Sequence, residues 1–258
     1  MSWRQRRFGY QCAFAFAAAA FLVAPARAQQ GNIQRIRFFT VKPDRVADFL
    51  AATKEFTEVV RKGGSEHYYY MLHSLTGANE YVRVDNYTKW ADLDGIASPE
   101  PKLKELDSQL QSITTRINQC VEIAHRIIDE IQPDLSLPQT GGVPMIRVLR
   151  TRVRPDKVNE YSALVKSEVL PAAKKAGVKF YTVSQVRYGE PNTEFVAVSG
   201  LNNWADLDGG LWIQKAMGEE GYQRFLAKLR PLIIESEAEI YSVVFDSSYQ
   251  PARRPAAK

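Results

Sequence analysis

The sequence is poor in cysteine and histidine, with two cysteines and three histidines in 258 residues. Cys12 lies in a segment that we expect to be removed, which leaves Cys120 alone and excludes an intramolecular disulfide in the remainder. His67 and His73 are six residues apart in one expected strand, about 20 Å, which is too far for both to bind one ion. We therefore expect no metal site, and stability that comes from core burial.

Several common chemical motifs are also missing. The chain has no glycine-rich phosphate loop, no G-x-S-x-G nucleophile elbow and no setting for a cysteine nucleophile. The sequence therefore does not indicate a nucleotide-binding protein or a hydrolase of these classes.

The N-terminus has the features of a secretory signal peptide. Basic residues at positions 4, 6 and 7 precede a small, apolar run over 12–25, and Ala26-Arg27-Ala28 fits a signal-peptidase site. The run of about 14 residues is shorter than the roughly 20 needed to span a bilayer. We expect residues 1–28 to be cleaved, giving an exported periplasmic or extracellular protein without stable membrane insertion; an uncleaved anchor is the alternative.

Basic residues are not in excess once this segment is removed. It holds four of the 34 basic residues and none of the 29 acidic ones, so the remainder has a net charge of about +1. Tight phosphate neutralisation needs a larger basic surplus. We therefore exclude nucleic acid as a partner.

The chain contains an internal repeat. Trp90-Ala-Asp-Leu-Asp-Gly95 recurs as Trp204-Ala-Asp-Leu-Asp-Gly209, and Val41-Lys-Pro-Asp-Arg-Val46 matches Val153-Arg-Pro-Asp-Lys-Val158. Alternating and helical apolar patterns predict the order strand, helix, strand, strand, helix, strand in each copy. The expected boundaries are a first repeat at 29–132, a linker at 133–144, a second repeat at 145–248 and a disordered tail at 249–258.

The repeated Trp motif has a structural and a chemical interpretation. We expect each Trp to pack beneath a following helix, with Asp92 and Asp94 near its positive end. Paired carboxylates beside an aromatic ring are also suited to acid–base chemistry or cation binding. The identity of both copies favours the structural interpretation.

The predicted order is that of the ferredoxin-like split βαβ unit, whose sheet carries both helices on one face. With its Val-x-Pro-Asp helix entry and its Trp motif, the repeat resembles the dimeric α+β barrel superfamily, which includes antibiotic-biosynthesis-monooxygenase-like and NIPSNAP-like proteins. This resemblance implies an α+β fold in which two tandem ferredoxin-like units join their sheets into one pseudo-dimeric barrel. A homodimer of the whole chain is a further possibility.

Strand parity predicts a ligand cavity inside this barrel. If Val82, Val84, Val196 and Val198 face the helices, then Tyr81, Arg83 and Asp85 face inward, opposite the smaller Ala197 and Ser199. The expected lining is aromatic and charged, with Arg83 as the anchor: His67, Tyr69, Tyr81, Arg83, Asp85 and Tyr181.

Three functions remain open at this level. The first is binding of a small apolar or aromatic molecule that carries an anionic or hydrogen-bonding group. The second is a cofactor-independent oxygenase or isomerase with His67 or Asp85 as the general base. Haem-binding members of the superfamily imply a haem-dependent variant, with His67, His73 or His125 as the axial ligand. The third is a filled barrel without a ligand, acting as an interaction module.

Overall fold

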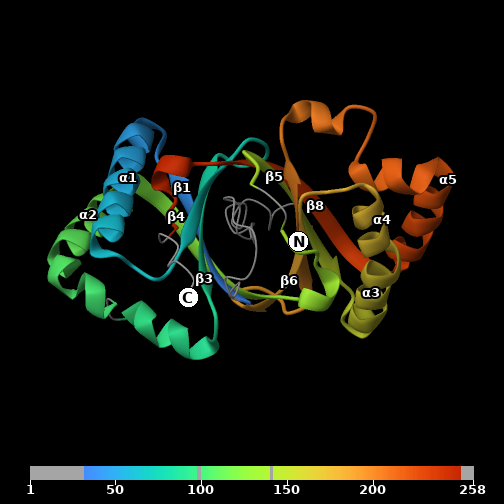
Figure 1. Cartoon of the computed structure of the whole chain (residues 1–258), viewed down its shortest axis with the longest axis horizontal. Coiled ribbons are helices and arrows are strands. Elements are labelled where there is room, and N and C mark those ends of the chain that lie inside the picture. The colour runs from blue at the N-terminus through green and yellow to red at the C-terminus, as the bar shows by residue number, and fades with distance from the viewer. Residues whose placement is uncertain (1–31, 98–99, 140–141, 251–258) are drawn as a thin grey trace, which may run out of the picture.

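The computed structural model describes residues 32–97, 100–139 and 142–250. Eight strands form one closed antiparallel barrel in the order β1-β3-β2-β8-β5-β7-β6-β4. Helices cover the barrel on two opposite sides, with α1 and α2 on one side and α3, α4 and α5 on the other (Figure 1). The expected signal peptide at 1–28 lies outside the described residues.

The predicted element order occurs twice. The first half contains β1 (Ile33–Val41), α1 (Val46–Gly63), β2 (Tyr69–Ser74), β3 (Glu80–Tyr87), α2 (Asp107–Cys120) and β4 (Val121–Ile131). The second half contains β5 (Met145–Val153), α3 (Val158–Leu164), the π-helical η8 (Val165–Val169), α4 (Leu170–Lys175), β6 (Tyr181–Tyr188), β7 (Glu194–Leu201), α5 (Trp212–Leu229) and β8 (Ile233–Val243). The halves join through β2 with β8 and β4 with β6.

Local sequence explains where the helices begin and end. A single turn at Pro43–Arg45 leads into α1, and Pro155–Lys157 leads into α3 in the same way, since proline fits the first helical turn. Gly64 ends α1 with a left-handed φ of 65° that favours glycine. Among the helices of the described residues, none combines the length and the apolar character that a bilayer span requires.

Buried apolar side chains line the barrel interior, and this corrects the predicted strand faces. Val82, Val84, Val196 and Val198 belong to one buried cluster that draws on strands of both halves. Residues of opposite parity, such as Tyr81, instead pack with Phe49 of α1. Because both sheet faces are buried in this fold, the apolar alternation does not reveal which face meets the helices. Arg83 and Asp85 therefore lie on the helix-covered face, and not inside the barrel as expected.

The Trp motif forms a tight turn outside the core. Oδ2 of Asp92 accepts hydrogen bonds from the Thr88 hydroxyl at 2.6 Å and the Thr88 amide at 3.1 Å. Asp206 accepts the equivalent amide bond from Asn202 at 2.6 Å. Trp90 and Trp204 are 41% and 50% exposed, so the expectation that they pack beneath a helix is wrong. The carboxylates hold the turn that follows each third strand.

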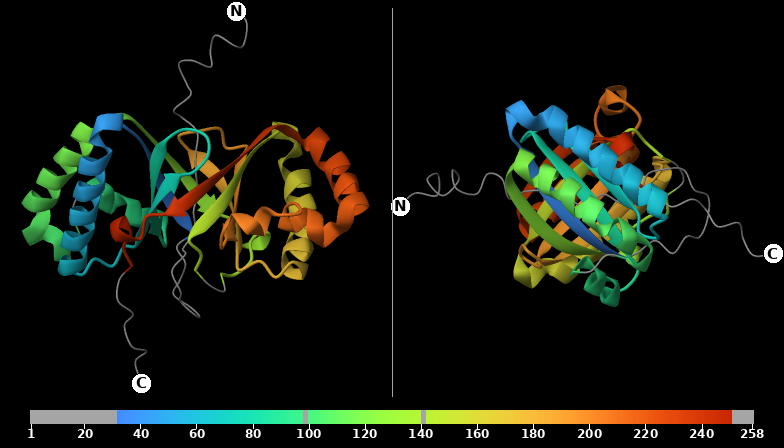
Figure 2. Two further views of the ribbon diagram at one scale, coloured as in Figure 1. Left: turned by 90° about the horizontal axis from the view of Figure 1, so that it is seen from above. Right: turned by 90° about the vertical axis from the view of Figure 1, so that its left-hand side faces the viewer.

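Two short segments cross from one half to the other. We call residues 245–249 the C-terminal strap and residues 133–137 the linker strap. Tyr249 forms a β-bridge with Tyr69 of the first half, and Leu137 forms the equivalent bridge with Tyr181 of the second. Figure 2 shows the red C-terminal segment reaching the helices of the first half. Tyr249, which we expected to begin a disordered tail, is only 3% exposed.

Candidate functional site

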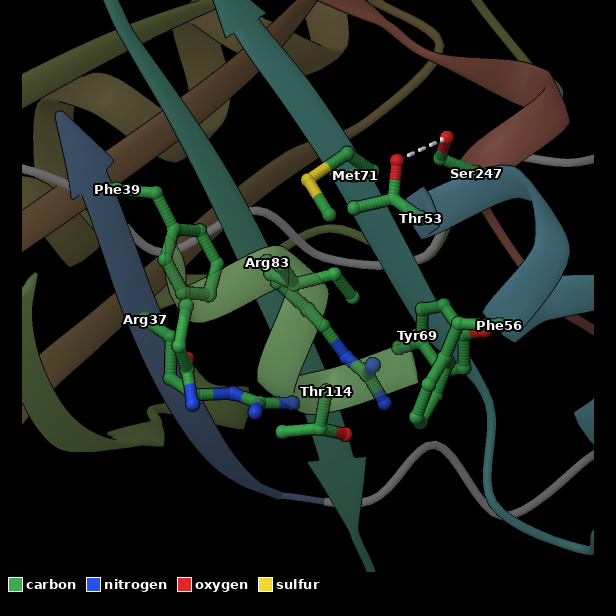
Figure 3. A pocket seen from close by; sticks show the side chains of 11 residues that line it. Arg37, Phe39, Thr53, Phe56, Tyr69, Met71, Arg83, Thr114 and Ser247 are labelled. Carbon is green, nitrogen blue, oxygen red and sulfur yellow. Dashed lines mark hydrogen bonds between the residues drawn. The ribbon is translucent and has the colours of Figure 1, made fainter. Parts of the chain in front are cut away.

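A cavity of about 80 Å³ lies between the barrel and the helices of the first half. Its apolar walls are Phe39, Phe56, Met71 and Ile117. Polar groups enter it from two strands, two helices and the C-terminal strap: Arg37, Arg83, Thr53, Thr114, Asn118 and Ser247. Figure 3 shows Arg37 and Arg83 at one end, near Thr114, and Thr53 with Ser247 at the other. Thr114 and Asn118 are exposed on α2 and mark the mouth.

Two half-buried guanidinium groups share one carboxylate beside this cavity. Arg37 Nη2 donates to Asp85 Oδ2 at 2.9 Å, and Arg83 Nε donates to Oδ1 at 2.9 Å. Burial alone would raise the pKa of Asp85, but the two arginines outweigh it, and the pKa lies below its usual value. The cluster of Arg37, Arg83 and Asp85 therefore carries one net positive charge near pH 7.

Arg83 is held by aromatic rings as well as by Asp85. Its Cζ atom lies 3.6 Å from the centre of the Tyr69 ring and 4.9 Å from that of Phe56. Tyr69 is anchored in turn by a 2.9 Å hydrogen bond between its hydroxyl and that of Thr57. Burial raises the pKa of Tyr69, so the phenol is neutral at pH 7. Cation–π stacking and ion pairing together fix the guanidinium plane.

Arg37 has unused donor capacity. Its Nε atom is buried and has no hydrogen-bond partner among the described residues. Burial lowers the pKa of Arg37 despite the opposing charge of Asp85, yet an arginine stays protonated at neutral pH. A buried cationic donor without an acceptor is costly. The rest of the group is more accessible, since the Arg37 side chain is 24% exposed and lines the cavity.

The second half lacks this cluster. The register of β5 on β7 pairs Leu149 with Ala197, as β1 on β3 pairs Arg37 with Arg83. Ser199 occupies the position of Asp85, opposite Tyr181 as Asp85 is opposite Tyr69. Leu149, Ala197 and Tyr181 pack in the apolar core of that half, where Tyr181 meets the Trp212 ring at 5.6 Å. The polar cavity therefore belongs to one half alone.

The structure unites only part of the predicted lining. Tyr69, Arg83 and Asp85 meet in the first half, whereas Tyr181 lies in the second. Tyr81 packs on Phe49 and His73 and does not line the cavity. His67 is 43% exposed in its side chain, 3.7 Å from Glu100, and is also outside the lining. One common cavity of these six residues, as predicted, does not form because they face two separate helix layers.

The three histidines lie apart from the first-half cavity and from one another. His73 stacks on Tyr81, and His125 lies 3.3 Å from Glu190. None of the three histidines lines the first-half cavity, whose volume of about 80 Å³ is far below the roughly 300 Å³ of a small ligand pocket. Haem therefore does not fit this cavity. The described residues contain no group of three or more potential metal ligands.

Most of the residues that line the cavity were missed from the sequence, among them Arg37 and Ser247. Arg37 could have been found from the alternation of Arg35 and Arg37 in the first strand, since two arginines at that spacing share one face. Ser247 follows the last strand, where no local pattern marks a site.

Comparisons with known proteins identify the fold. No protein-family model matches the sequence, and no curated protein matches it. A candidate monooxygenase of Lactobacillus acidophilus NCFM has a TM-score of 0.58 and 9% identity, over 82% of this chain and 93% of that chain. A candidate monooxygenase of Fusobacterium nucleatum subsp. nucleatum has a TM-score of 0.60 and 12% identity, over 82% and 92%. An anthrone oxidase-like protein has a TM-score of 0.50 and 12% identity, over 82% and 91%. At these identities the similarity is one of fold.

Proposed function

We propose that the chain, whose fold is that of dimeric α+β barrel proteins, belongs to this superfamily and binds a small organic anion in its first half, between the sheet and α1 and α2. The apolar body of the ligand contacts Phe39, Met71 and Ile117, and its anionic group lies at the cluster of Arg37, Arg83 and Asp85. In this view each half is a ferredoxin-like unit and the mature chain is exported from the cell.

The unbalanced positive charge of the cluster of Arg37, Arg83 and Asp85 at the cavity is the observation that carries this proposal. The Asp85 carboxylate balances one of the two guanidinium charges. Arg83 already contacts Oδ1 of Asp85 through Nε at 2.9 Å and through Nη2 at 2.8 Å. An anion in the cavity beside Arg37 balances the second charge. Charge-assisted hydrogen bonds of this kind are the stronger ones, so the anionic group provides most of the selectivity.

The asymmetry between the halves supports a functional role for the cluster. Leu149, Ala197 and Ser199 show that the fold closes without charges at these positions. Buried ion pairs add little net stability over apolar packing. Stability therefore does not account for the charged cluster, whereas ligand binding does.

The oxygenase alternative finds no general base in this cavity. The pKa of Asp85 is lowered by Arg37 and Arg83, so it is a poor proton acceptor, and His67 lies outside the lining. The names of the structural neighbours suggest oxygenases, but no residue of this site favours that activity. A ligand-free interaction module is consistent with the apolar barrel interior but gives the first-half cavity no function.

The test is an NMR titration of the full chain with matched anionic and neutral probes. We expect propionate and butyrate to bind at least about tenfold more tightly than propionamide and butyramide, since the amides lack the charge. Arg37→Leu and Arg83→Ala introduce the residues that the second half already uses, and they should abolish the preference for the anion. Arg152→Ala, which removes an exposed arginine paired with Glu235, is the control and should change nothing. Equal binding of acid and amide, or an unchanged preference in Arg37→Leu, would reject the proposal.

A further inference from the structure

The deep end of the cavity is built by a residue from the other half of the chain. Ser247 belongs to the C-terminal strap, is 2% exposed, and reaches Thr53 of α1 across a separation of 194 residues. Lys54 pairs with Asp246 at 3.0 Å, and Ser248 accepts a hydrogen bond from the Met71 amide at 2.9 Å. The strap is therefore fixed on both sides of Ser247, which places its hydroxyl in the cavity (Figure 3).

Counting hydrogens shows what this hydroxyl offers to a ligand. Thr53 Oγ1 donates to the Leu50 carbonyl at 3.0 Å, which uses its only hydrogen. In the 2.9 Å contact between the Thr53 and Ser247 hydroxyls, Ser247 is then the donor. A hydroxyl has one hydrogen and two acceptor lone pairs. Ser247 therefore presents only an acceptor to the cavity.

The cavity is thus polarised along its length. Arg37 and Arg83 present donors at one end, and Ser247 presents an acceptor at the other (Figure 3). Thr53 and Ser247 correspond to Val165 and Leu135 in the second half, and both of these are buried in its apolar core. The hydroxyl pair and the arginine cluster therefore occur together in one half and are absent together from the other.

From this polarity we infer that the ligand is a short-chain hydroxy acid, and that Ser247 is a specificity-determining residue that accepts a hydrogen bond from the hydroxyl of the ligand. This inference rests on the proposed function, because it needs the carboxylate to lie at Arg37. The hydroxyl is remote from the carboxylate, since the two sets of groups lie at opposite ends. The cavity volume of about 80 Å³ leaves room for only a short chain between the two groups.

The experiment compares 4-hydroxybutyrate with butyrate, which differ by one hydroxyl. Dissociation constants are measured by NMR titration of the full chain, with the Arg Nε–H signals as reporters. We expect 4-hydroxybutyrate to bind about tenfold more tightly, the upper range for one neutral hydrogen bond. Ser247→Ala should remove this preference and leave the affinity for butyrate unchanged.

Two further variants separate specificity from loss of the fold. Ser247→Leu copies Leu135 of the second half and should fill the deep end of the cavity. The affinity for both acids should then fall at least about tenfold, while the melting temperature stays unchanged. Thr115→Val removes an exposed hydroxyl outside the cavity and should leave the preference intact.

The outcomes distinguish the two proposals. Equal binding of the two acids, or a preference that survives in Ser247→Ala, overturns the hydroxy-acid inference and leaves anion binding standing. Failure of both acids to bind the wild-type chain overturns the proposed function and this inference with it.

Discussion

The Nζ atom of Lys54 lies 3.0 Å from Oδ2 of Asp246, and the same contact recurs between Lys166 and Asp134 at 2.9 Å. Each pair joins the first helix of one half to the strap supplied by the other. A second pair of contacts is also repeated. Ser248 accepts a hydrogen bond from the Met71 amide, and Ser136 accepts one from the Val183 amide, both at 2.9 Å. The two halves therefore exchange straps reciprocally.

The first prediction concerns the buried end of the C-terminal strap. Tyr249→Ala should lower the free energy of unfolding by about 3–5 kcal/mol, as for other large buried aromatics, since Tyr249 packs with Tyr69 and donates to the Ser65 carbonyl. Urea denaturation measures this loss. Tyr188→Ala is the control, because Tyr188 is 63% exposed. Equal effects of the two substitutions would show that the strap is not part of the stable structure.

The second prediction concerns a proton inside the barrel. The Tyr241 hydroxyl lies 3.1 Å from Glu80 Oε1 and 3.0 Å from Glu239 Oε2. A phenol has one hydrogen, so one of these carboxyl groups holds a proton of its own. Burial raises the pKa of Glu80 to about 8, and that of Asp129, which accepts a bond from Ser184, also to about 8.

These shifts set the sign of a pH dependence. A carboxyl group whose pKa is higher in the folded than in the unfolded chain binds more protons when folded, so its contribution to stability is lost as the pH rises. The loss should begin above the unfolded pKa of about 4 and be complete above pH 8, with a size on the order of a few kcal/mol. Glu80→Gln and Asp129→Asn should each flatten the curve of unfolding free energy against pH. A stability that rises between pH 5 and pH 8 would contradict both assignments.

The third prediction separates charge balance from packing in the cluster of Arg37, Arg83 and Asp85. Asp85→Ser leaves two buried cations without an anion and should cost about 3–5 kcal/mol of unfolding free energy. The triple variant Arg37→Leu, Arg83→Ala, Asp85→Ser reproduces Leu149, Ala197 and Ser199, and should recover most of this loss. A triple variant less stable than Asp85→Ser in urea denaturation would show that the arginines stabilise the fold by packing alone.

The fourth prediction is the stoichiometry of ligand binding. Calorimetric titration with 4-hydroxybutyrate should give one site per chain, because Leu149 and Ala197 replace Arg37 and Arg83 in the second half, and Val165 and Leu135 replace the hydroxyl pair. A value of two would show that the second half also binds the anion.

Much of the architecture could be predicted from the sequence. The repeated Trp and Pro-Asp motifs divide the chain into two copies, and their patterns give the order of strands and helices that is observed. The closed barrel, which the resemblance implies, is confirmed.

The faces of the strands could not be predicted in this way. In β3, Val82 and Val84 are fully buried inside the barrel, while Tyr81 and Asp85 are nearly as buried beneath the helices. Neither face of the strand meets water. The alternation of side chains therefore separates the two faces but does not show which one points into the barrel and which one meets the helices. The contribution of Ser247 was equally hidden, since its contact with Thr53 spans 194 residues and no local pattern reports such a pairing.

The covalent link between the halves has a consequence for symmetry. In a barrel built from two identical chains, every substitution appears twice, and a change that fills one cavity also fills the other. Here Leu135 and Ser247 occupy equivalent places in one polypeptide, so each can be exchanged independently. One copy can therefore have apolar packing at these positions while the other keeps its polar groups. A symmetric dimer cannot do this, because its two chains have the same sequence.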